Sequence, residues 1–118
     1  MAIVTVLSDA IGMSTKHLTQ PIIVKLKNSQ ESKEFNQKLA QAFGLALREI
    51  RKEVDISQEN LALIAGIERS HYGRIERGLH APTFDIAFRI AKVLDISAAE
   101  LVGRTEKYLL TLEGEQHE

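Results

Sequence analysis

The chain has 118 residues, of which 44% are hydrophobic and 26% charged, a composition typical of one globular domain with a modest core. It contains no cysteine, which excludes disulfides, thiolate metal sites and cysteine nucleophiles and fits a reducing compartment, so we expect a cytoplasmic protein. The formal net charge is −1, whereas proteins that coat nucleic acids nonspecifically are strongly basic. Any contact with nucleic acid must therefore rest on local positive charge.

Residues 1–34 are predicted to form an N-terminal extension. Two short β-branched runs, residues 3–7 and 22–26, fit two β-strands of a hairpin, an arm exchanged in a dimer, or a segment without fixed structure. The first run lacks the basic region of a secretory signal, and no apolar run has the length of a membrane span, so we expect no membrane partner. The polar residues 28–33 are predicted to link this extension to the helical part.

From Phe35 onward the pattern is helical. Apolar side chains recur at steps of three and four residues, which predicts a first helix with one buried stripe that ends at Asp55, because aspartate tolerates the left-handed conformation at a helix end. The residues of this stripe are Leu39, Phe43, Leu47, Ile50 and Val54.

Two short helices on either side of a glycine are predicted next. Ser57 is a good N-cap for a helix over residues 58–65. Gly66 supplies a tight turn, and a third helix over residues 69–77 ends at Gly78. Two short helices joined by such a turn are typical of a helix-turn-helix.

The rest of the chain predicts two further helices. Thr83 caps a fourth helix and Ser97 a short fifth helix that holds Leu101. The side chains of the fourth helix that we expect to face inward are Phe84, Ala87, Ile90, Ala91 and Leu94. The sequence therefore predicts an all-α fold, with a five-helix domain over residues 35–103 and a C-terminal extension over residues 104–118 whose acidic tail is frayed.

Four motifs occur in the order and spacing of a known family. They are Ser57-Gln58-Glu59-Asn60-Leu61-Ala62, Ala65-Gly66-Ile67, Ile75-Glu76-Arg77-Gly78 and Ala81-Pro82-Thr83. Residues 43–102 resemble the lambda-repressor/Cro-type (Xre-like) helix-turn-helix domain. This resemblance implies a transcriptional regulator, a repressor or controller protein, whose partner is double-stranded DNA. Within it, the third helix is also similar to the controller proteins of restriction-modification systems.

The resemblance assigns roles to individual residues. Gln58 matches a glutamine that contacts a phosphate and braces the recognition helix, and Ala62 and Gly66 match small residues that let the two helices approach. Arg51 and Glu76 match a buried structural ion pair between the first and third helices. The residues that it and the helical pattern place at the DNA are Gln58, Glu68, Arg69, Ser70, His71, Arg74, Arg77 and His80.

Helical spacing supports the same assignment independently. Ser70 and Arg74 lie one turn apart, and Arg77 continues their face. An arginine fork that binds guanine O6 and N7 discriminates by about 1–3 kcal/mol. The alternative is that these side chains are ordinary solvated charges. Tyr72 and Ile75 are predicted to be core residues that aim the helix.

Two residues depart from the family pattern. Glu68 stands where Ser or Thr is common, and because glutamate is a poorer cap and repels phosphate, it either reads a cytosine amino group or weakens binding. Gly73 lies inside the recognition helix, where glycine costs about 1 kcal/mol relative to alanine unless a close backbone approach requires it.

Other functions are weighed against DNA binding. The four histidines show no metal-ligand spacing and no glycine-rich phosphate loop follows a strand, so we expect no catalytic site, no metal and no cofactor. The main alternative is an antitoxin-like or adaptor protein that binds a protein partner, and RNA binding comes third because no aromatic platform is visible.

A DNA-binding domain this small is predicted to act as a homodimer. Few phosphate contacts per copy favour two copies on a pseudo-palindromic operator with half-sites one helical turn apart. The expected dimer surfaces are the end of the fourth helix, residues 98–102 and residues 108–112, because Tyr108, Leu109 and Leu112 have little core left to fill. The N-terminal extension is the alternative dimer element.

Overall fold

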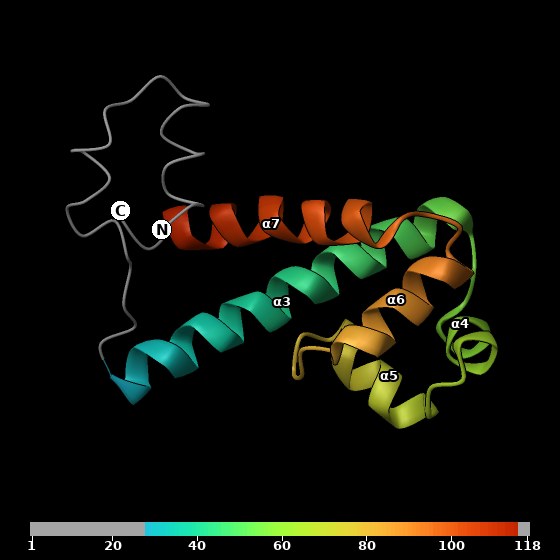
Figure 1. Ribbon diagram of the computed structural model, residues 1–118, viewed down its shortest axis with the longest axis horizontal. Coiled ribbons are helices and arrows are strands. Elements are labelled where there is room, and N and C mark those ends of the chain that lie inside the picture. Colours follow the sequence, from blue (N-terminus) through green and yellow to red (C-terminus); the bar gives the residue numbers. More distant parts are fainter. Residues whose placement is uncertain (1–27, 116–118) are drawn as a thin grey trace, which may run out of the picture.

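The computed structural model describes residues 28–115, which form five α-helices and, within that range, no strand. In Figure 1 the two long helices lie against each other in opposite directions, and the three short helices gather at the end of the pair where the first long helix finishes and the second begins. None of the described helices is long and apolar enough to cross a membrane. The helices are α3 (Ser29–Val54), α4 (Gln58–Ala65), α5 (Arg69–Glu76), α6 (Phe84–Val93) and α7 (Ala98–Glu115).

The all-α fold with five helices is confirmed. The predicted strands at residues 3–7 and 22–26 lie outside the described residues. The turn at Asp55 is as expected, because this residue adopts the left-handed conformation with φ 61° and closes α3. Asp95 adopts the same conformation, with φ 57°, just after α6 ends.

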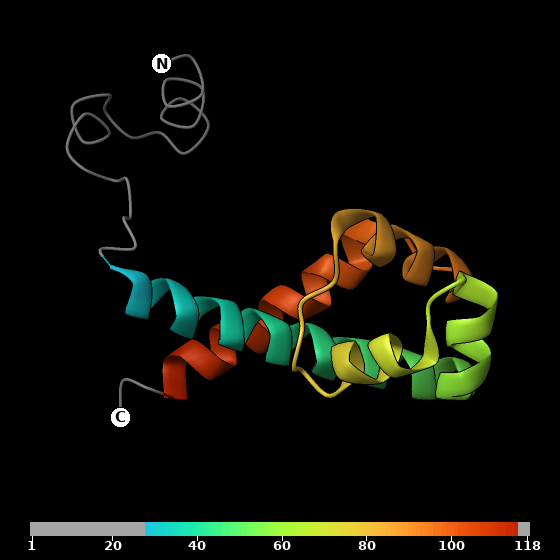
Figure 2. The same ribbon diagram turned by 90° about the horizontal axis from the view of Figure 1, so that it is seen from below.

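The prediction of a linker at residues 28–33 is wrong, because α3 already begins at Ser29. Asn28 is its N-cap, and its side chain accepts a hydrogen bond of 2.9 Å from the backbone N–H of Glu31. As Figure 2 shows, the first turns of α3 extend away from the short helices. They carry few apolar residues because they meet little of the core, so hydrophobic periodicity does not reveal them.

The core lies where the short helices meet α3 and the start of α7. It takes Phe43, Leu47 and Ile50 from α3 and adds side chains from every other helix. These are Leu61, Ala62, Ala65, Ile67, Tyr72, Ile75, Ile90, Ala91, Leu94 and Leu101.

Two residues expected to face inward are exposed instead. Val54 is 46% exposed because it is the last residue of α3, and Phe84 is 81% exposed because it opens α6 before that helix reaches the core. The Phe84 ring packs on Phe88 of the same helix, with ring centroids 4.7 Å apart. Thr83 is the N-cap of α6 by position, but its hydroxyl donates to the Asp85 side chain rather than capping the backbone.

The fifth helix is not short. Ser97 caps it as predicted, accepting from the Glu100 N–H at 3.0 Å, but α7 continues through residue 103 to Glu115. Leu109 and Leu112 are half-buried, and Tyr108 donates a 2.7 Å hydrogen bond to Glu49 of α3. As predicted, none of these three residues belongs to the core cluster. They are partly covered all the same, because α3 and α7 run beside each other further than the sequence pattern revealed.

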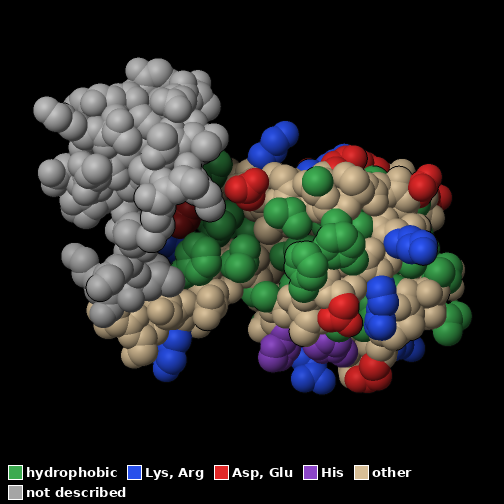
Figure 3. Space-filling view, in the orientation of Figure 1, with side chains coloured by type: hydrophobic (Ala, Val, Ile, Leu, Met, Phe, Trp, Pro, Cys, Tyr) green, Lys and Arg blue, Asp and Glu red, His purple; other side chains and the backbone are tan. Residues whose placement is uncertain are grey.

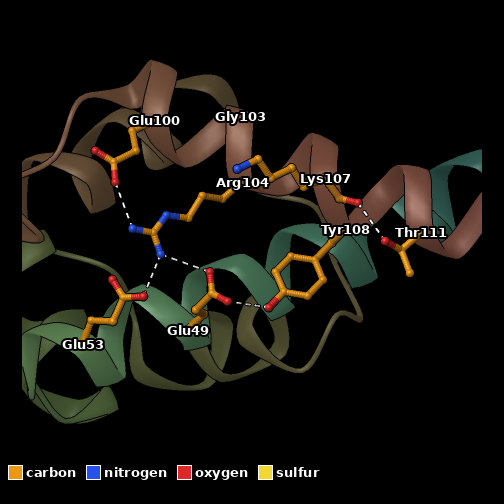
Figure 4. A pocket seen from close by; sticks show the side chains of 8 residues that line it. All are labelled: Glu49, Glu53, Glu100, Gly103, Arg104, Lys107, Tyr108 and Thr111. Atoms are coloured by element: carbon orange, nitrogen blue, oxygen red, sulfur yellow. Dashed lines mark hydrogen bonds and ion pairs between the residues drawn. The ribbon is translucent and has the colours of Figure 1, made fainter.

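A polar network holds α7 to α3 along one side. Figure 4 shows the Arg104 guanidinium between three carboxylates. It lies 3.0 Å from Glu49 and 2.8 Å from Glu53 on α3, and 3.0 Å from Glu100 on its own helix. The hydrogen bond from Tyr108, followed by that from Arg104, lowers the pKa of Glu49. One guanidinium is thus shared by three carboxylates from two helices, which makes this cluster a structural contact between α3 and α7.

Gly44 sets how closely α3 and α5 approach. A Cβ atom added there would lie 2.6 Å from the Glu76 carbonyl oxygen and 3.1 Å from the Gly78 nitrogen, both backbone atoms. A Cβ added at Gly66, which the sequence had assigned to helix approach, would meet nothing within 4 Å. Gly66 is needed instead for its φ of 70°, which forms the turn.

The Gly44→Ala variant is expected to lower the free energy of unfolding by about 1–3 kcal/mol, because its methyl group pushes backbone against backbone. Gly103→Ala is the matched control in α7, where a Cβ meets nothing within 4 Å, and should raise stability by up to about 1 kcal/mol. Urea denaturation followed by circular dichroism measures both. Equal stabilisation by the two alanines would contradict the close approach at Gly44.

Candidate nucleic-acid interface

The pair α4 and α5 is joined by a short turn with well-defined ends. The Ser57 side chain caps α4 by accepting from the Asn60 N–H at 3.1 Å. Gly66 ends the helix in the left-handed conformation, and its carbonyl accepts a 3.0 Å hydrogen bond from Arg89 of α6. The turn is therefore held from both sides, which fixes the direction in which α5 leaves it.

The start of α5 is capped by Glu68. Its carboxylate accepts a 3.2 Å hydrogen bond from the Ser70 N–H and a second from the Ser70 hydroxyl. The Ser70 side chain is the largest cause of the lowered pKa of Glu68, and its backbone N–H is the next. Glutamate thus occupies the place of the usual Ser or Thr cap, and its charge lies at the positive end of the helix.

The two sides of α5 differ completely in exposure. Tyr72, Ile75 and Glu76 are buried, whereas Ser70, Arg74 and Arg77 are exposed. Neither Arg74 nor Arg77 forms an ion pair with any residue between 28 and 115. The buried side anchors the helix, and the opposite side presents cations to solvent.

Two histidines lie at the same surface. The rings of His71 and His80 have centroids 6.4 Å apart, which brings the loop after α5 beside the helix. In Figure 3 the histidine side chains gather next to lysine and arginine side chains at one edge of the molecule. We call Ser70, His71, Arg74, Arg77 and His80 the α5 surface.

Arg69 has an ion-pair partner within the protein, and Gln58 lies near a buried carboxylate. Arg69 contacts Glu59 of α4 at 2.8 Å, with both side chains exposed. Gln58 is among the hydrogen-bonding groups that lower the pKa of Glu76, which places its side chain against α5. Of the residues expected at the DNA, Arg69 therefore connects the two helices of the motif through an ion pair, and Gln58 lies near Glu76 of α5.

Beneath the α5 surface is a buried ion pair between Arg51 and Glu76. The Arg51 Nη2 atom lies 2.7 Å from Glu76 Oε1, and its Nε atom is 3.0 Å from both carboxylate oxygens. A further Arg51 nitrogen donates to the Ile56 carbonyl at 2.9 Å. The Glu76 side chain is only 2% exposed, so the pair ties α5 to α3 in a largely water-free setting.

Tyr72 lies beside this pair. Its hydroxyl is buried and has no well-formed hydrogen bond within the described part of the chain. Burial, followed by the neighbouring Glu76, raises the pKa of Tyr72 well above its ordinary value. The phenol therefore stays neutral, and its ring fills the core under α5 as predicted.

The pKa of Glu76 reflects two opposing effects. Burial, the largest single effect, raises it, but the hydrogen bonds from Arg51, together with the nearby Tyr72 and Gln58 side chains, outweigh burial and lower the pKa below the ordinary 4.5. A carboxyl whose pKa is lower in the folded state stabilises the fold above the unfolded-state pKa, and this stabilisation is lost as the pH falls through the folded-state pKa.

Glu76→Gln is expected to lower the free energy of unfolding at pH 7 by about 3–5 kcal/mol, since it leaves the Arg51 charge buried without its counterion. Denaturation at several pH values checks the mechanism. The parent protein should lose stability as the pH falls below 4.5, and the variant should lose less over that interval. An identical pH dependence in both proteins would contradict a lowered pKa at Glu76.

Three residues that matter to this region were not identified from the sequence as part of it. Glu59 was seen only as a favourable charge at the start of α4, Gly44 had no assigned role, and Arg89 gave no signal. Each acts through a contact with a residue of another helix or turn, which residue spacing within one helix does not reveal. The described residues hold no group of three or more His, Asp or Glu that could bind a metal ion.

Known proteins share this arrangement. A family model described as helix-turn-helix matches residues 47–101. The chain is 31% identical over 64 residues to the cryptic phage CTXphi transcriptional repressor RstR of Vibrio cholerae, covering 54% of this chain and 58% of RstR. It is 42% identical over 62 residues to the uncharacterized HTH-type transcriptional regulator YazB of Bacillus subtilis, covering 52% of this chain and 90% of YazB.

A solved structure agrees. The restriction-modification controller protein C.AhdI from Aeromonas hydrophila is 39% identical, with a TM-score of 0.51 over 52% of this chain and 94% of C.AhdI. This chain spans little more than half the length of RstR, the first of these relatives.

A capped short helix, a glycine turn and a second helix anchored on one side define a helix-turn-helix domain. With YazB matched over nearly its whole length, the chain belongs to the lambda-repressor-like (Xre-like) helix-turn-helix family. The resemblance drawn from the four sequence motifs is thereby confirmed.

Proposed function

We propose that this protein is a transcriptional regulator that binds double-stranded DNA sequence-specifically by placing α5 in the major groove. The observation that carries this is the α5 surface, where Arg74 and Arg77 point away from the core with no ion-pair partner among the described residues. Because the whole chain has a formal net charge of −1, this local concentration of cations is what would attract DNA.

The residues of this surface divide between two kinds of contact. Ser70 in the first turn of α5 and Arg74 in its last turn read base edges, since Arg74 is free to form two hydrogen bonds to a guanine. Arg77 and His80, at the end of the helix and in the following loop, contact phosphates and set the register. Gln58, at the start of α4, contacts a further phosphate, which the backbone N–H groups of that helix end also favour.

A homodimer is part of this proposal. One copy offers few phosphate contacts, and two copies on a pseudo-palindromic operator double them with half-sites about one helical turn apart. The surfaces proposed for dimer contact are the end of α6, residues 98–102 and residues 108–112. Val102 is 50% exposed and Leu110 is 68% exposed, which leaves apolar area there for a second copy.

The proposal extends to the limits of the domain. We assign DNA binding to residues 35–103, treat residues 1–34 and 104–118 as extensions, and expect a cytoplasmic protein that needs no cofactor and has no catalytic role. RstR and YazB carry names of transcriptional regulators, which supports a regulatory rather than an enzymatic function. Both limits fall inside helices, because α3 already begins at Ser29 and α7 continues to Glu115.

A second function, docking of a protein partner, is favoured by exposed apolar side chains on α4 and α6. These residues are Leu63, Ile64, Phe84 and Phe88, between 50% and 81% exposed. An adaptor or antitoxin-like protein would use such a surface, and the two functions differ in whether purified protein selects a DNA sequence.

Arg74→Ala tests the reading of bases. A random pool of DNA duplexes is first enriched with the purified protein, and affinities are then measured by fluorescence anisotropy for the enriched duplex and for a scrambled duplex at two salt concentrations. The variant should bind the enriched duplex about 5- to 150-fold more weakly, the loss expected of one bidentate base contact, and its preference over the scrambled duplex should shrink.

Lys33→Ala is the matched control, since it removes one exposed positive charge at the start of α3. It should weaken binding to both duplexes slightly and equally. Failure of the parent protein to enrich any sequence would refute the proposed function and favour the docking of a protein partner. A preference unchanged by Arg74→Ala would remove Arg74 from the base-reading set.

Gly73→Ala tests why the recognition helix contains glycine. Alanine should raise the free energy of unfolding by up to about 1 kcal/mol through its helix propensity. Its Cβ would lie 3.0 Å from the Arg77 Nη1 atom, so the Arg77 side chain must move, and we expect weaker binding to the enriched duplex. Thermal unfolding and anisotropy measure the two effects. Unchanged affinity in the stabilised variant would show that the interface does not need this glycine.

A further inference from the structure

The first residue of α5 is bound to a carboxylate of α4. The Arg69 Nη2 atom lies 2.8 Å from Glu59 Oε1, and the side chains are 78% and 65% exposed. This contact crosses from one helix of the motif to the other on the outside of the molecule, between residues ten positions apart in the sequence. Unlike Arg74 and Arg77, Arg69 therefore presents its charge already paired.

The pairing leaves Arg69 able to bind more. Only one of its nitrogens meets Glu59, through one hydrogen bond, whereas a guanidinium carries five N–H donors and a guanine edge needs two. Arg69 also opens α5, and the N-terminal residues of a recognition helix are the ones that reach base edges. Glu59 lies in the first turn of α4, where the helix dipole stabilises its negative charge.

We propose that Glu59 is a positioning residue for DNA specificity. It orients the Arg69 guanidinium toward a guanine, and its negative charge weakens the attraction of Arg69 to backbone phosphates. This inference rests on the proposed DNA-binding function. A free arginine loses side-chain entropy when it is ordered on a base, and one already held by a carboxylate loses less. The carboxylate also repels phosphates, so the pair adds little to binding that depends on backbone charge alone.

The two effects act in opposite directions on the two kinds of DNA. Removing the Glu59 charge frees Arg69 to contact any phosphate, which tightens binding to unrelated sequences. The same change no longer holds the Arg69 side chain in the orientation that contacts the guanine, which weakens binding to the preferred sequence. A purely electrostatic role would instead tighten both, and a purely structural role would weaken both.

Glu59→Gln separates these cases, and Glu106→Gln is its control. Glu106 is exposed on α7 and forms no ion pair with the described residues, so both variants remove one negative charge. Anisotropy with the enriched and scrambled duplexes gives the ratio of affinities for each protein. Glu59→Gln should lower the affinity for the enriched duplex and raise that for the scrambled duplex, each by about two- to fivefold, the effect of one exposed ion pair.

Glu106→Gln should leave the ratio of affinities unchanged. In an Arg69→Ala background, Glu59→Gln should no longer alter the ratio, because the positioned side chain is absent. The inference is overturned if Glu59→Gln shifts both affinities in the same direction. It is also overturned if the parent protein selects the enriched duplex and the variant has the same ratio of affinities, and in either case the proposed function stands. A parent protein that selects no sequence overturns both.

Discussion

The position of α5 depends on one buried ion pair, between Arg51 of α3 and Glu76 of α5. Removing two charges from water is costly, and this pair is stable because the Glu76 carboxylate receives several hydrogen bonds at once. Close packing supports it, since only a glycine fits at residue 44 where the two helices meet. With α5 fixed in this way, the direction of every exposed side chain on it follows from helical geometry.

Charge has different uses on the two sides of the same helix. Glu76 is buried and neutralised to hold α5 in place, whereas Arg74 and Arg77 are exposed and form no ion pair with residues 28–115. Glu68 and Glu59 then add negative charge at the edge of the cationic side, one engaged by Ser70 and the other by Arg69. The protein is near neutral as a whole, so the exposed arginines of this one helix provide local rather than general positive charge, which suits selective attraction to DNA.

Local signals in the sequence predicted the short helices well and the long ones poorly. Ser57, Asp55 and Gly66 specify helix ends through their own backbone preferences, so α4 and the turns beside it could be placed to the residue. The start of α3 and the length of α7 depend on how those helices lie against each other, through contacts such as Tyr108 with Glu49. The pairing of Arg69 with Glu59 was missed for the same reason.

The most direct test of the account is to locate the DNA on the folded protein. Backbone amide NMR spectra recorded during titration with the enriched duplex show which residues change chemical shift when DNA binds. If α5 lies in the major groove, the largest shifts should occur at the start of α4 and from Glu68 through His80, with Leu63, Phe84 and Phe88 little affected. Shifts concentrated on those apolar residues, or no saturable shifts at all, would contradict it.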